Sequence, residues 1–326
     1  MKRVTALVLL AVLLGGCVAS EAAPSDRAAA VAEGPGTGFG EAAGATDATD
    51  ATGPTGPTGA TGGTGAGAAL PDPEERVPLT PVRLARVLED TVTANRDAIS
   101  RWATSGGSAR WPVAEDVVLL TLYEQRIYRV LAQHARLADR VVRRLPHQLG
   151  VEARTTFTAG RALYEHFTPV KRVPDFRIRK PESADALLSS FRQGEDRFGV
   201  AWQVLAAVML VETRMGRIRS SSSAGAQGPM QFLPSTWDAY GLGGDIHDPH
   251  DAVLGAANYL NASGAPEDYR RALYAYNPVD AYVTAVWSYA KVMMRDPNAY
   301  YAFYNWQIFV RTTHGDVRLS GPGFPV

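Results

Sequence analysis

The sequence predicts an all-α protein, and three observations indicate this fold class. Apolar residues recur at roughly helical spacing between positions 117 and 145, and Pro146 ends the run. The stretch Ala201–Val211 is apolar on every side, which is typical of a central helix surrounded by other helices. Strand signals are confined to positions 308–319. We therefore expect a helical body with a small hairpin near the C-terminus.

The first half of this body, residues 77–181, is predicted to be a basic helical region. Ordered structure is expected from about Val77, with a further helix from Gly150 to His166. Between Arg76 and Pro181 there are 19 Lys+Arg against 10 Asp+Glu. This composition is explained either by solvated helix faces or by a surface that meets an anionic wall or membrane.

The second half, residues 182–296, shows start signals for helices. Ser183 stands where an N-cap is expected, and Pro234, Pro249 and Pro266 stand where first-turn prolines are expected. In the C-terminal extension, residues 297–326, two short apolar runs predict the hairpin. They are Ile308–Val310 and Val317–Leu319, and they flank a turn at His314-Gly315-Asp316.

Composition excludes several classes of protein. The chain has 326 residues, 46% of them hydrophobic, which is enough for one or two ordinary soluble cores. The 33 Lys+Arg balance 33 Asp+Glu, which argues against a nucleic-acid binder that depends on an overall positive field. The one cysteine, Cys17, excludes a disulfide framework and a cysteine-based zinc cluster.

The N-terminus has the pattern of an export signal. Residues 1–16 carry Lys2 and Arg3 before an apolar run that is too short to span a bilayer as a mature helix. Leu14-Gly15-Gly16-Cys17 resembles the lipobox of bacterial lipoproteins, which implies cleavage before Cys17 and acylation of its thiol, for example with palmitate. The alternative is an ordinary signal peptide that happens to precede a cysteine. The resemblance implies an extracytoplasmic protein anchored to the cell membrane by lipid.

Residues 17–76 are expected to be a lipidated cysteine followed by a disordered tether. From Glu21 to Leu70, Ala, Gly, Thr and Pro supply 39 of 50 positions. Such a segment cannot bury enough apolar surface to offset the entropy lost on ordering.

Glu212 follows the apolar stretch Ala201–Val211 directly. A carboxyl at the C-terminal end of a buried helix is desolvated and lies near the negative end of the helix dipole, and both effects favour the protonated form. A protonated carboxyl is what a general acid needs in order to protonate a glycosidic oxygen. The alternative is a glutamate that reaches water or pairs with Arg214 or Arg217.

The segment Thr213–Trp237 contains no acidic residue. Because glycosidases normally pair two carboxylates, either a second acid comes from farther along or the substrate supplies its own nucleophile. The available acids are Asp238, Asp245, Asp248 and Asp251.

Three motifs follow in the order found in lytic transglycosylases. They are Glu212-Thr-Arg-Met-Gly216, Ser223-Ala-Gly-Ala-Gln-Gly-Pro-Met-Gln-Phe-Leu-Pro-Ser-Thr-Trp237 and Ala275-Tyr-Asn277. With them, positions 187–290 resemble the soluble and membrane-bound murein transglycosylases (the SLT type, glycoside hydrolase family 23), which share a lysozyme-like domain with goose-type lysozymes. The resemblance covers about a third of the chain and implies a lysozyme-like transglycosylase domain over residues 182–296.

The resemblance also implies a role for each motif. Glu212 is the sole catalytic acid and base, Met230 and Gln231 lie along the sugar-binding groove, and Tyr276 and Asn277 help to hold the catalytic carboxyl and the substrate's N-acetyl group. No cofactor or metal is implied. Two departures stand out: Thr213 replaces the usual serine, and Pro278 should end the preceding helix by disfavouring helical backbone at Asn277.

The segment Asp245–Asp251 contains several potential metal ligands. We interpret Asp248, which precedes Pro249, as a helix N-cap rather than a calcium ligand, and His247 and His250 as surface residues rather than zinc ligands. The remaining aromatic residues of interest are core candidates, of which one or two could line a glycan groove: Trp202, Trp237, Tyr240, Tyr274, Trp287 and Tyr289.

These features lead to one main hypothesis and two alternatives. The main hypothesis is a monomeric, lipid-anchored lytic transglycosylase, a carbon-oxygen lyase that cleaves the β-1,4 bond between MurNAc and GlcNAc in peptidoglycan and leaves 1,6-anhydro-MurNAc ends. The first alternative is a hydrolytic muramidase, in which one of the four aspartates positions water. The second is a peptidoglycan-binding lipoprotein without catalysis. None of the three involves nucleic acid.

Overall fold

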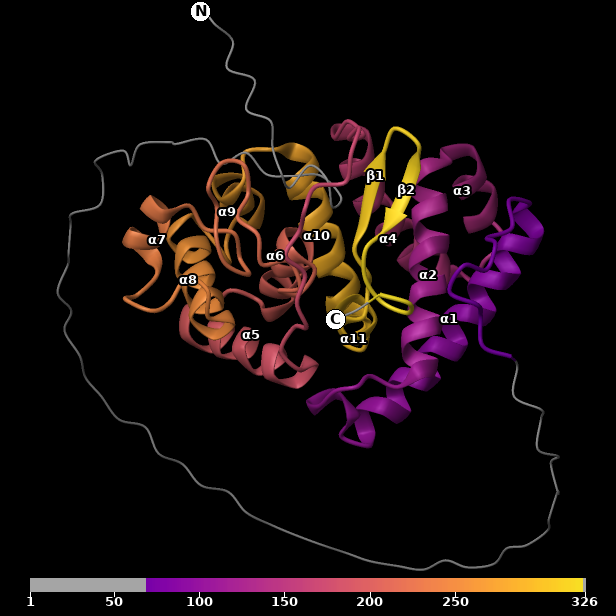
Figure 1. Cartoon of the computed structure of the whole chain (residues 1–326), viewed down its shortest axis with the longest axis horizontal. Coiled ribbons are helices and arrows are strands. Elements are labelled where there is room, and N and C mark those ends of the chain that lie inside the picture. Colours follow the sequence, from indigo (N-terminus) through magenta and orange to yellow (C-terminus); the bar gives the residue numbers. More distant parts are fainter. Residues whose placement is uncertain (1–68, 325–326) are drawn as a thin grey trace, which may run out of the picture. The chain divides into compact units, whose positions relative to one another are not determined.

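The computed structural model describes residues 69–324. The predicted signal peptide, Cys17 and most of the predicted tether lie outside these residues. The described chain is mainly helical with one small hairpin, which confirms the predicted all-α class (Figure 1). No helix between positions 69 and 324 combines the length and apolar character needed to cross a membrane.

The first group of helices precedes residue 170. It consists of α1 (Pro81–Thr104), the short 3-10 helix η2 (Gly107–Ala109), α2 (Glu115–Gln133), α3 (Ala135–Val142) and α4 (His147–His166). The apolar run from 117 to 145 is therefore two helices rather than one, because the backbone leaves the helical region at His134, with φ −121° and ψ 78°. Helix α4 begins three residues before the predicted Gly150.

The second group of helices follows residue 183. It consists of α5 (Ala184–Phe198), α6 (Trp202–Thr213), α7 (Pro234–Tyr240), α8 (Pro249–Ala262), α9 (Tyr269–Tyr276), α10 (Asp280–Arg295) and α11 (Ala299–Tyr304). The predicted starts at Ser183, Pro234 and Pro249 are confirmed, and the Ser183 hydroxyl accepts a hydrogen bond from the Ala186 amide at 3.2 Å. The start predicted at Pro266 is wrong: Asp268 caps α9 instead, accepting from the Arg271 amide at 3.0 Å.

The chain ends in the predicted hairpin, made of β1 (Phe309–Thr312) and β2 (Gly315–Arg318). The strands are antiparallel, with Phe309 opposite Arg318 and Arg311 opposite Asp316. The turn is shorter than predicted, because Gly315 and Asp316 belong to β2. Phe309 and Arg311 lie on one face of β1, and Val310 lies on the opposite face. Val310 is buried with Ile218 and Ile308 in a small hydrophobic cluster that is separate from the main core.

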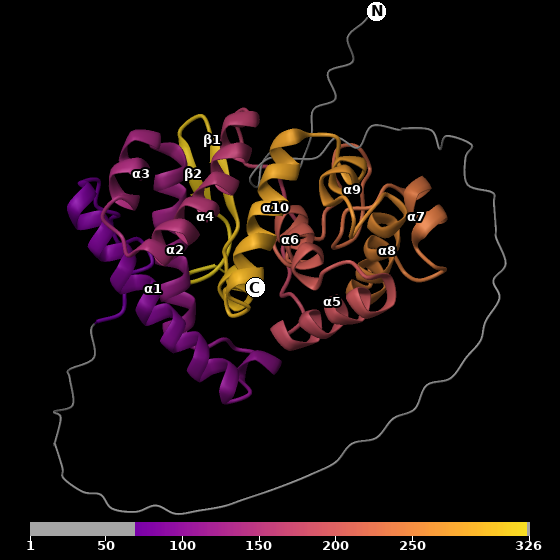
Figure 2. The ribbon, with the colours of Figure 1, turned by 180° about the vertical axis from the view of Figure 1, so that it is seen from behind.

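Helix α10 joins the two groups of helices. It packs against α4 on one side and against α6 on the other (Figures 1 and 2). One hydrophobic cluster accordingly runs through both groups, from Leu84 in α1 to Trp306 after α11. The helices before residue 170 therefore share one hydrophobic core with the helices around α6, and α10 links the two groups.

A reciprocal pair of buried glutamines fastens the segment before the hairpin to α2. The Gln125 side chain donates to the Gln307 carbonyl at 2.9 Å and accepts from the Gln307 amide at 2.8 Å. The Gln307 side chain in turn accepts from the Ser320 hydroxyl, which itself accepts from the Ile308 amide. Because all these groups are buried, each bond also avoids the cost of an unsatisfied polar atom.

Glu124, one residue before Gln125, is a buried acid outside the predicted domain of residues 182–296. Its carboxyl accepts from the Asn95 side chain at 2.6 Å, and Asn95 accepts from the Thr121 hydroxyl at 2.9 Å. Burial raises the pKa of Glu124 from 4.5 to about 7, and the nearby carboxylate Glu152 acts in the same direction. The Asn95 hydrogen bond and the Arg96 guanidinium oppose this shift.

This raised pKa predicts a pH dependence of stability. Between pH 4.5 and about 7 the folded state holds the Glu124 proton more tightly than the unfolded state does, so stability is lost as the pH rises through this window. Glu124→Gln keeps the acceptor for Asn95 but removes the titration, and it should stabilise the protein at about pH 8 by about 3 kcal/mol. The gain should vanish below about pH 4. Urea unfolding at both pH values measures this, with exposed Asp90→Asn as the control. Equal stability of Glu124→Gln and the parent chain at about pH 8 would contradict the assignment.

Candidate active site

Helix α6 places Glu212 inside the protein. Every residue from Val204 to Thr213 is buried, as expected for a stretch that is apolar on all sides, and Glu212 is 1% exposed. The alternative in which its side chain reaches bulk water is therefore excluded. Glu212 also lies in the last turn of α6, near the negative end of the helix dipole.

The chain reverses sharply directly after α6. Arg214, Met215 and Gly216 all have left-handed backbone, with φ between 56° and 76°. The Arg214 guanidinium donates to the Leu210 carbonyl at 3.0 Å, and that of Arg217 donates to the Tyr304 carbonyl at 2.7 Å. Burial lowers the pKa of Arg214 to about 10. Arg214 thus satisfies a carbonyl in the last turn of α6, and Arg217 satisfies the carbonyl of the last residue of α11.

Two hydroxyl groups hold the loop that follows, residues 220–232, between the other two motifs. The Thr213 hydroxyl donates to the Pro229 carbonyl at 2.6 Å and accepts from the Gly216 amide at 3.0 Å. The Tyr276 hydroxyl donates to the Met230 carbonyl at 2.7 Å. The three motifs singled out in the sequence are thus brought together at the backbone of residues 229 and 230. Thr213 performs this role with its hydroxyl and lies fully buried.

Gln231 and Asn277 present buried amide groups at this junction. The Gln231 side chain donates to the Gly228 carbonyl at 2.9 Å, and its Oε1 is buried without a partner in the described chain. Asn277 is 1% exposed, and within residues 69–324 neither Oδ1 nor Nδ2 of its amide has a hydrogen-bond partner. Its backbone is extended, with φ −149° and ψ 111°, so the helix ends at Tyr276 as Pro278 predicts.

Aromatic rings surround the same junction. Tyr276 lies edge-on to Phe232, with ring centroids 5.8 Å apart, and stacks parallel to Tyr282 at 6.5 Å. Tyr259 contacts Tyr276 at 5.6 Å and donates its hydroxyl to the Ala275 carbonyl. These rings fix the position of the segment that carries Tyr276 and Asn277.

The side chains predicted as core or groove residues have different environments. Met230 is fully buried in the core, and its carbonyl, rather than its thioether, makes the contact with Tyr276. Trp202 and Tyr289 are buried, whereas Trp237, Tyr240 and Trp287 are half-buried. Tyr274 is 47% exposed and is not a core residue.

The four aspartates considered as a second acid are not buried. Among the acidic side chains of residues 69–324, Glu124 and Glu212 alone are buried. Asp245 accepts from the His247 amide, Asp248 from the Asp251 amide at 3.0 Å, and Asp251 from the Asp245 amide at 2.9 Å. The last of these bonds and His250 hold the pKa of Asp251 below its usual range. These carboxylates therefore organise the loop before α8, and Asp248 caps that helix as predicted.

The close approach of Gly228 to the segment before α8 is a feature of the site that the three motifs do not predict. Gly228 has φ +73°, and a Cβ at this position would lie 1.8 Å from the Ile246 carbonyl oxygen. The loop of residues 220–232 is thereby pressed against the segment before α8. In the sequence, Gly228 is followed directly by Pro229. A glycine–proline pair is a local signal of a turn, and glycine allows another backbone segment to approach closely.

The domain that contains this junction matches a known family. Residues 189–291 match the family model of the transglycosylase SLT domain. This range begins in α5, ends in α10 and contains Glu212, Gln231 and Asn277. The chain therefore carries an SLT-type transglycosylase domain, as its three motifs predicted.

A particular relative resembles a longer part of the chain. The membrane-bound lytic murein transglycosylase F of Thiobacillus denitrificans is 29% identical over 161 residues, which cover 45% of this chain and 34% of the relative. The chain thus spans about a third of the length of that protein. No solved structure matches the chain.

Gly228→Ala should disturb the junction more than a matched glycine substitution does. Gly225 has φ +82°, and a Cβ added there would meet nothing within 4 Å, so Gly225→Ala should cost only the left-handed strain, about 1 kcal/mol. Gly228→Ala adds the clash with Ile246 and should cost at least about 2 kcal/mol more. Urea unfolding of both variants measures the difference. Equal losses would show that the Ile246 contact does not constrain the loop.

Asp248→Ala should destabilise the protein by about 1 kcal/mol, because the first turn of α8 loses its cap. Asp248→Asn should stay close to the parent chain, since asparagine caps equally well. Thermal unfolding with and without added calcium measures both effects. A calcium-dependent gain in the parent chain that Asp248→Asn abolishes would replace the capping interpretation with a metal site.

Proposed function

We propose that this protein is a lytic transglycosylase that cleaves peptidoglycan between MurNAc and GlcNAc. The observation that carries the proposal is the set of buried amide atoms on Gln231 and Asn277 without partners in the described chain, in the domain where Glu212 is buried. A buried polar atom without a hydrogen-bond partner destabilises the folded state by about 1–3 kcal/mol. A ligand that forms hydrogen bonds with these atoms would remove that penalty. The hydroxyl and N-acetyl groups of an amino sugar offer both donors and acceptors to an amide.

In this proposal Glu212 acts first as an acid and then as a base. Its carboxyl protonates the oxygen of the β-1,4 bond, the C1–O bond of the muramyl sugar breaks, and positive charge develops at that carbon. The C6 hydroxyl of the same sugar then attacks C1 and gives its proton to the Glu212 carboxylate. The product is a 1,6-anhydro ring, no water is consumed, and Glu212 regains its proton.

The position of the other acids favours this intramolecular route over hydrolysis. A muramidase would require a second carboxylate to position water, and Asp245, Asp248 and Asp251 each accept a backbone hydrogen bond instead. Asp238 is exposed on α7. A C6 hydroxyl supplied by the substrate needs no such partner.

We also propose that the protein is held at the membrane through a lipidated Cys17, with residues 17–76 as the tether and residues 77–181 as a helical region ahead of the catalytic domain. Support comes from the lipobox pattern Leu14-Gly15-Gly16-Cys17 and from the relative, which is named as membrane-bound. The anchor would place the domain next to the wall polymer outside the cytoplasm.

Glu212→Gln tests the mechanism, because the amide keeps the shape of the side chain but cannot donate this proton. Release of anhydro-muropeptides from purified wall should fall by at least about 100-fold, as is typical for loss of a general acid. Mass spectrometry of the products measures this and also separates anhydro ends from hydrolysed ends. Exposed Glu267→Gln should retain full activity. Undiminished release by Glu212→Gln would refute the mechanism, and reducing ends that have gained water would establish a muramidase.

A further inference from the structure

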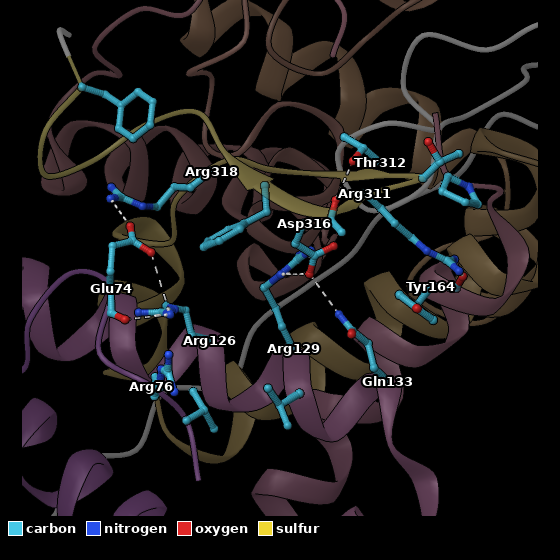
Figure 3. Close-up of a pocket in the computed structure, with 17 residues that line it drawn as sticks. Glu74, Arg76, Arg126, Arg129, Gln133, Tyr164, Arg311, Thr312, Asp316 and Arg318 are labelled. Atoms are coloured by element: carbon cyan, nitrogen blue, oxygen red, sulfur yellow. Dashed lines mark hydrogen bonds and ion pairs between the residues drawn. The ribbon is translucent and has the colours of Figure 1, made fainter. Parts of the chain in front are cut away.

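A cavity of about 880 Å³ lies outside the transglycosylase domain. Its walls are the segment 74–77, α2, the end of α4 with Pro169, and the C-terminal hairpin, and none of its lining residues falls within positions 189–291 (Figure 3). It is therefore separate from the junction around Glu212. Its size lies in the range of small-molecule and peptide sites.

The register of the hairpin explains why polar side chains line this cavity. Phe309 and Arg311 of β1 lie opposite Arg318 and Asp316 of β2, so these four side chains share one face of the hairpin. Val310, on the other face, is buried. The polar face turns toward Arg126, Arg129 and Gln133 of α2, as Figure 3 shows.

The cavity carries an excess of positive charge. Its lining contains five guanidinium groups and two carboxylates, which gives a net formal charge of three positive: Arg76, Arg126, Arg129, Arg311, Arg318, Glu74 and Asp316. Arg129 pairs with Asp316 at 2.6 Å, and Arg318 pairs with Glu74 at 2.7 Å. Three guanidinium groups thus exceed the carboxylates available to neutralise them.

Arg311 and Arg126 are held in place mainly by contacts with an aromatic ring and with backbone carbonyls rather than by ion pairs. Arg311 stacks over the Tyr164 ring at 3.6 Å and donates to the Phe167 carbonyl at 3.0 Å. Arg126 donates to the Pro73 carbonyl at 2.7 Å and lies 3.9 Å from the Glu74 carboxylate that Arg318 already engages. Arg76 is exposed, and its side chain makes no hydrogen bond or ion pair with the rest of the described chain. A guanidinium that is already oriented loses less entropy when it binds an anion.

We propose that this cavity binds the carboxylate-bearing stem peptide of a peptidoglycan strand. Arginine forks bind carboxylates with two parallel hydrogen bonds. Glu74, whose side chain is 70% exposed, offers an acceptor for the amino group of a diamino acid, and Phe309 and Val77 offer apolar wall. A polyphosphate chain fits less well, because it carries no amino group to bind the exposed Glu74 carboxylate. The identity of this ligand as a wall peptide rests on the proposed function.

Titration calorimetry of the purified full chain tests the proposal with a soluble stem tetrapeptide that carries free carboxylates and a free side-chain amine. The parent chain should bind it, and amidation of the carboxylates should weaken binding about tenfold or more. Arg76→Gln should weaken binding about fivefold while leaving the unfolding temperature unchanged, since Arg76 is exposed. Arg86→Gln, an exposed arginine on α1 that does not line the cavity, should bind like the parent chain.

Three results would overturn the assignment. They are equal affinity for the amidated peptide, unchanged affinity in Arg76→Gln, and equally tight binding of poly(glycerol phosphate) that also depends on Arg76. The last result would make the cavity a site for a phosphate polymer.

A parallel digestion separates this proposal from the proposed function. The parent chain and Arg76→Gln should cut peptide-free glycan strands equally, whereas Arg76→Gln should lose the parent chain's preference for peptide-bearing strands. Cleavage without peptide binding would overturn the cavity assignment alone. Peptide binding through Arg76 by a chain that cuts no glycan would overturn the proposed function and leave the cavity assigned to an acidic peptide.

Discussion

Helix α6 is enclosed by α5, α8, α10 and α11, and the environment of Glu212 follows from that enclosure. The helix has no polar face, and every residue from Val204 to Thr213 is buried. The carboxyl in its last turn is therefore buried as well. Arg214 and Arg217 stabilise the end of this enclosed helix by donating to the backbone carbonyls of Leu210 and Arg214.

Much of the fold could be predicted because its signals are local. The uniform apolar stretch 201–211 indicates a central helix, and Ser183 and Asp248 act as caps through bonds to residues three positions away. The break at His134 could not be predicted in this way, since apolar spacing continues across it and both α2 and α3 contact α1. Proline is common in the first turn of a helix, which is why Pro266 predicts a helix start. Helix α9 instead begins after Asp268, because the Asp268 side chain caps it.

The site shows a different limit of sequence reasoning. The resemblance to lytic transglycosylases indicates which motifs form the site, but the bonds that join these motifs use the carbonyl groups of Pro229 and Met230. Backbone carbonyls leave no signature in a sequence, so neither bond could be predicted. The arginine excess before residue 181 is visible in the sequence, but the cavity that contains part of it also depends on the hairpin of residues 309–318, which lies far along the chain.

The bond between Gln125 and Gln307 has a consequence for the order of folding. Its partners are 182 positions apart, so a large loop of chain must be closed before the bond can form. Nearby pairings within the helical groups form sooner, because rates fall as the sequence separation of contacts grows. Residues 309–318, which contribute two arginines to the wall of the cavity, follow every helix that encloses α6, so the cavity is completed only after the carboxyl of Glu212 has been surrounded.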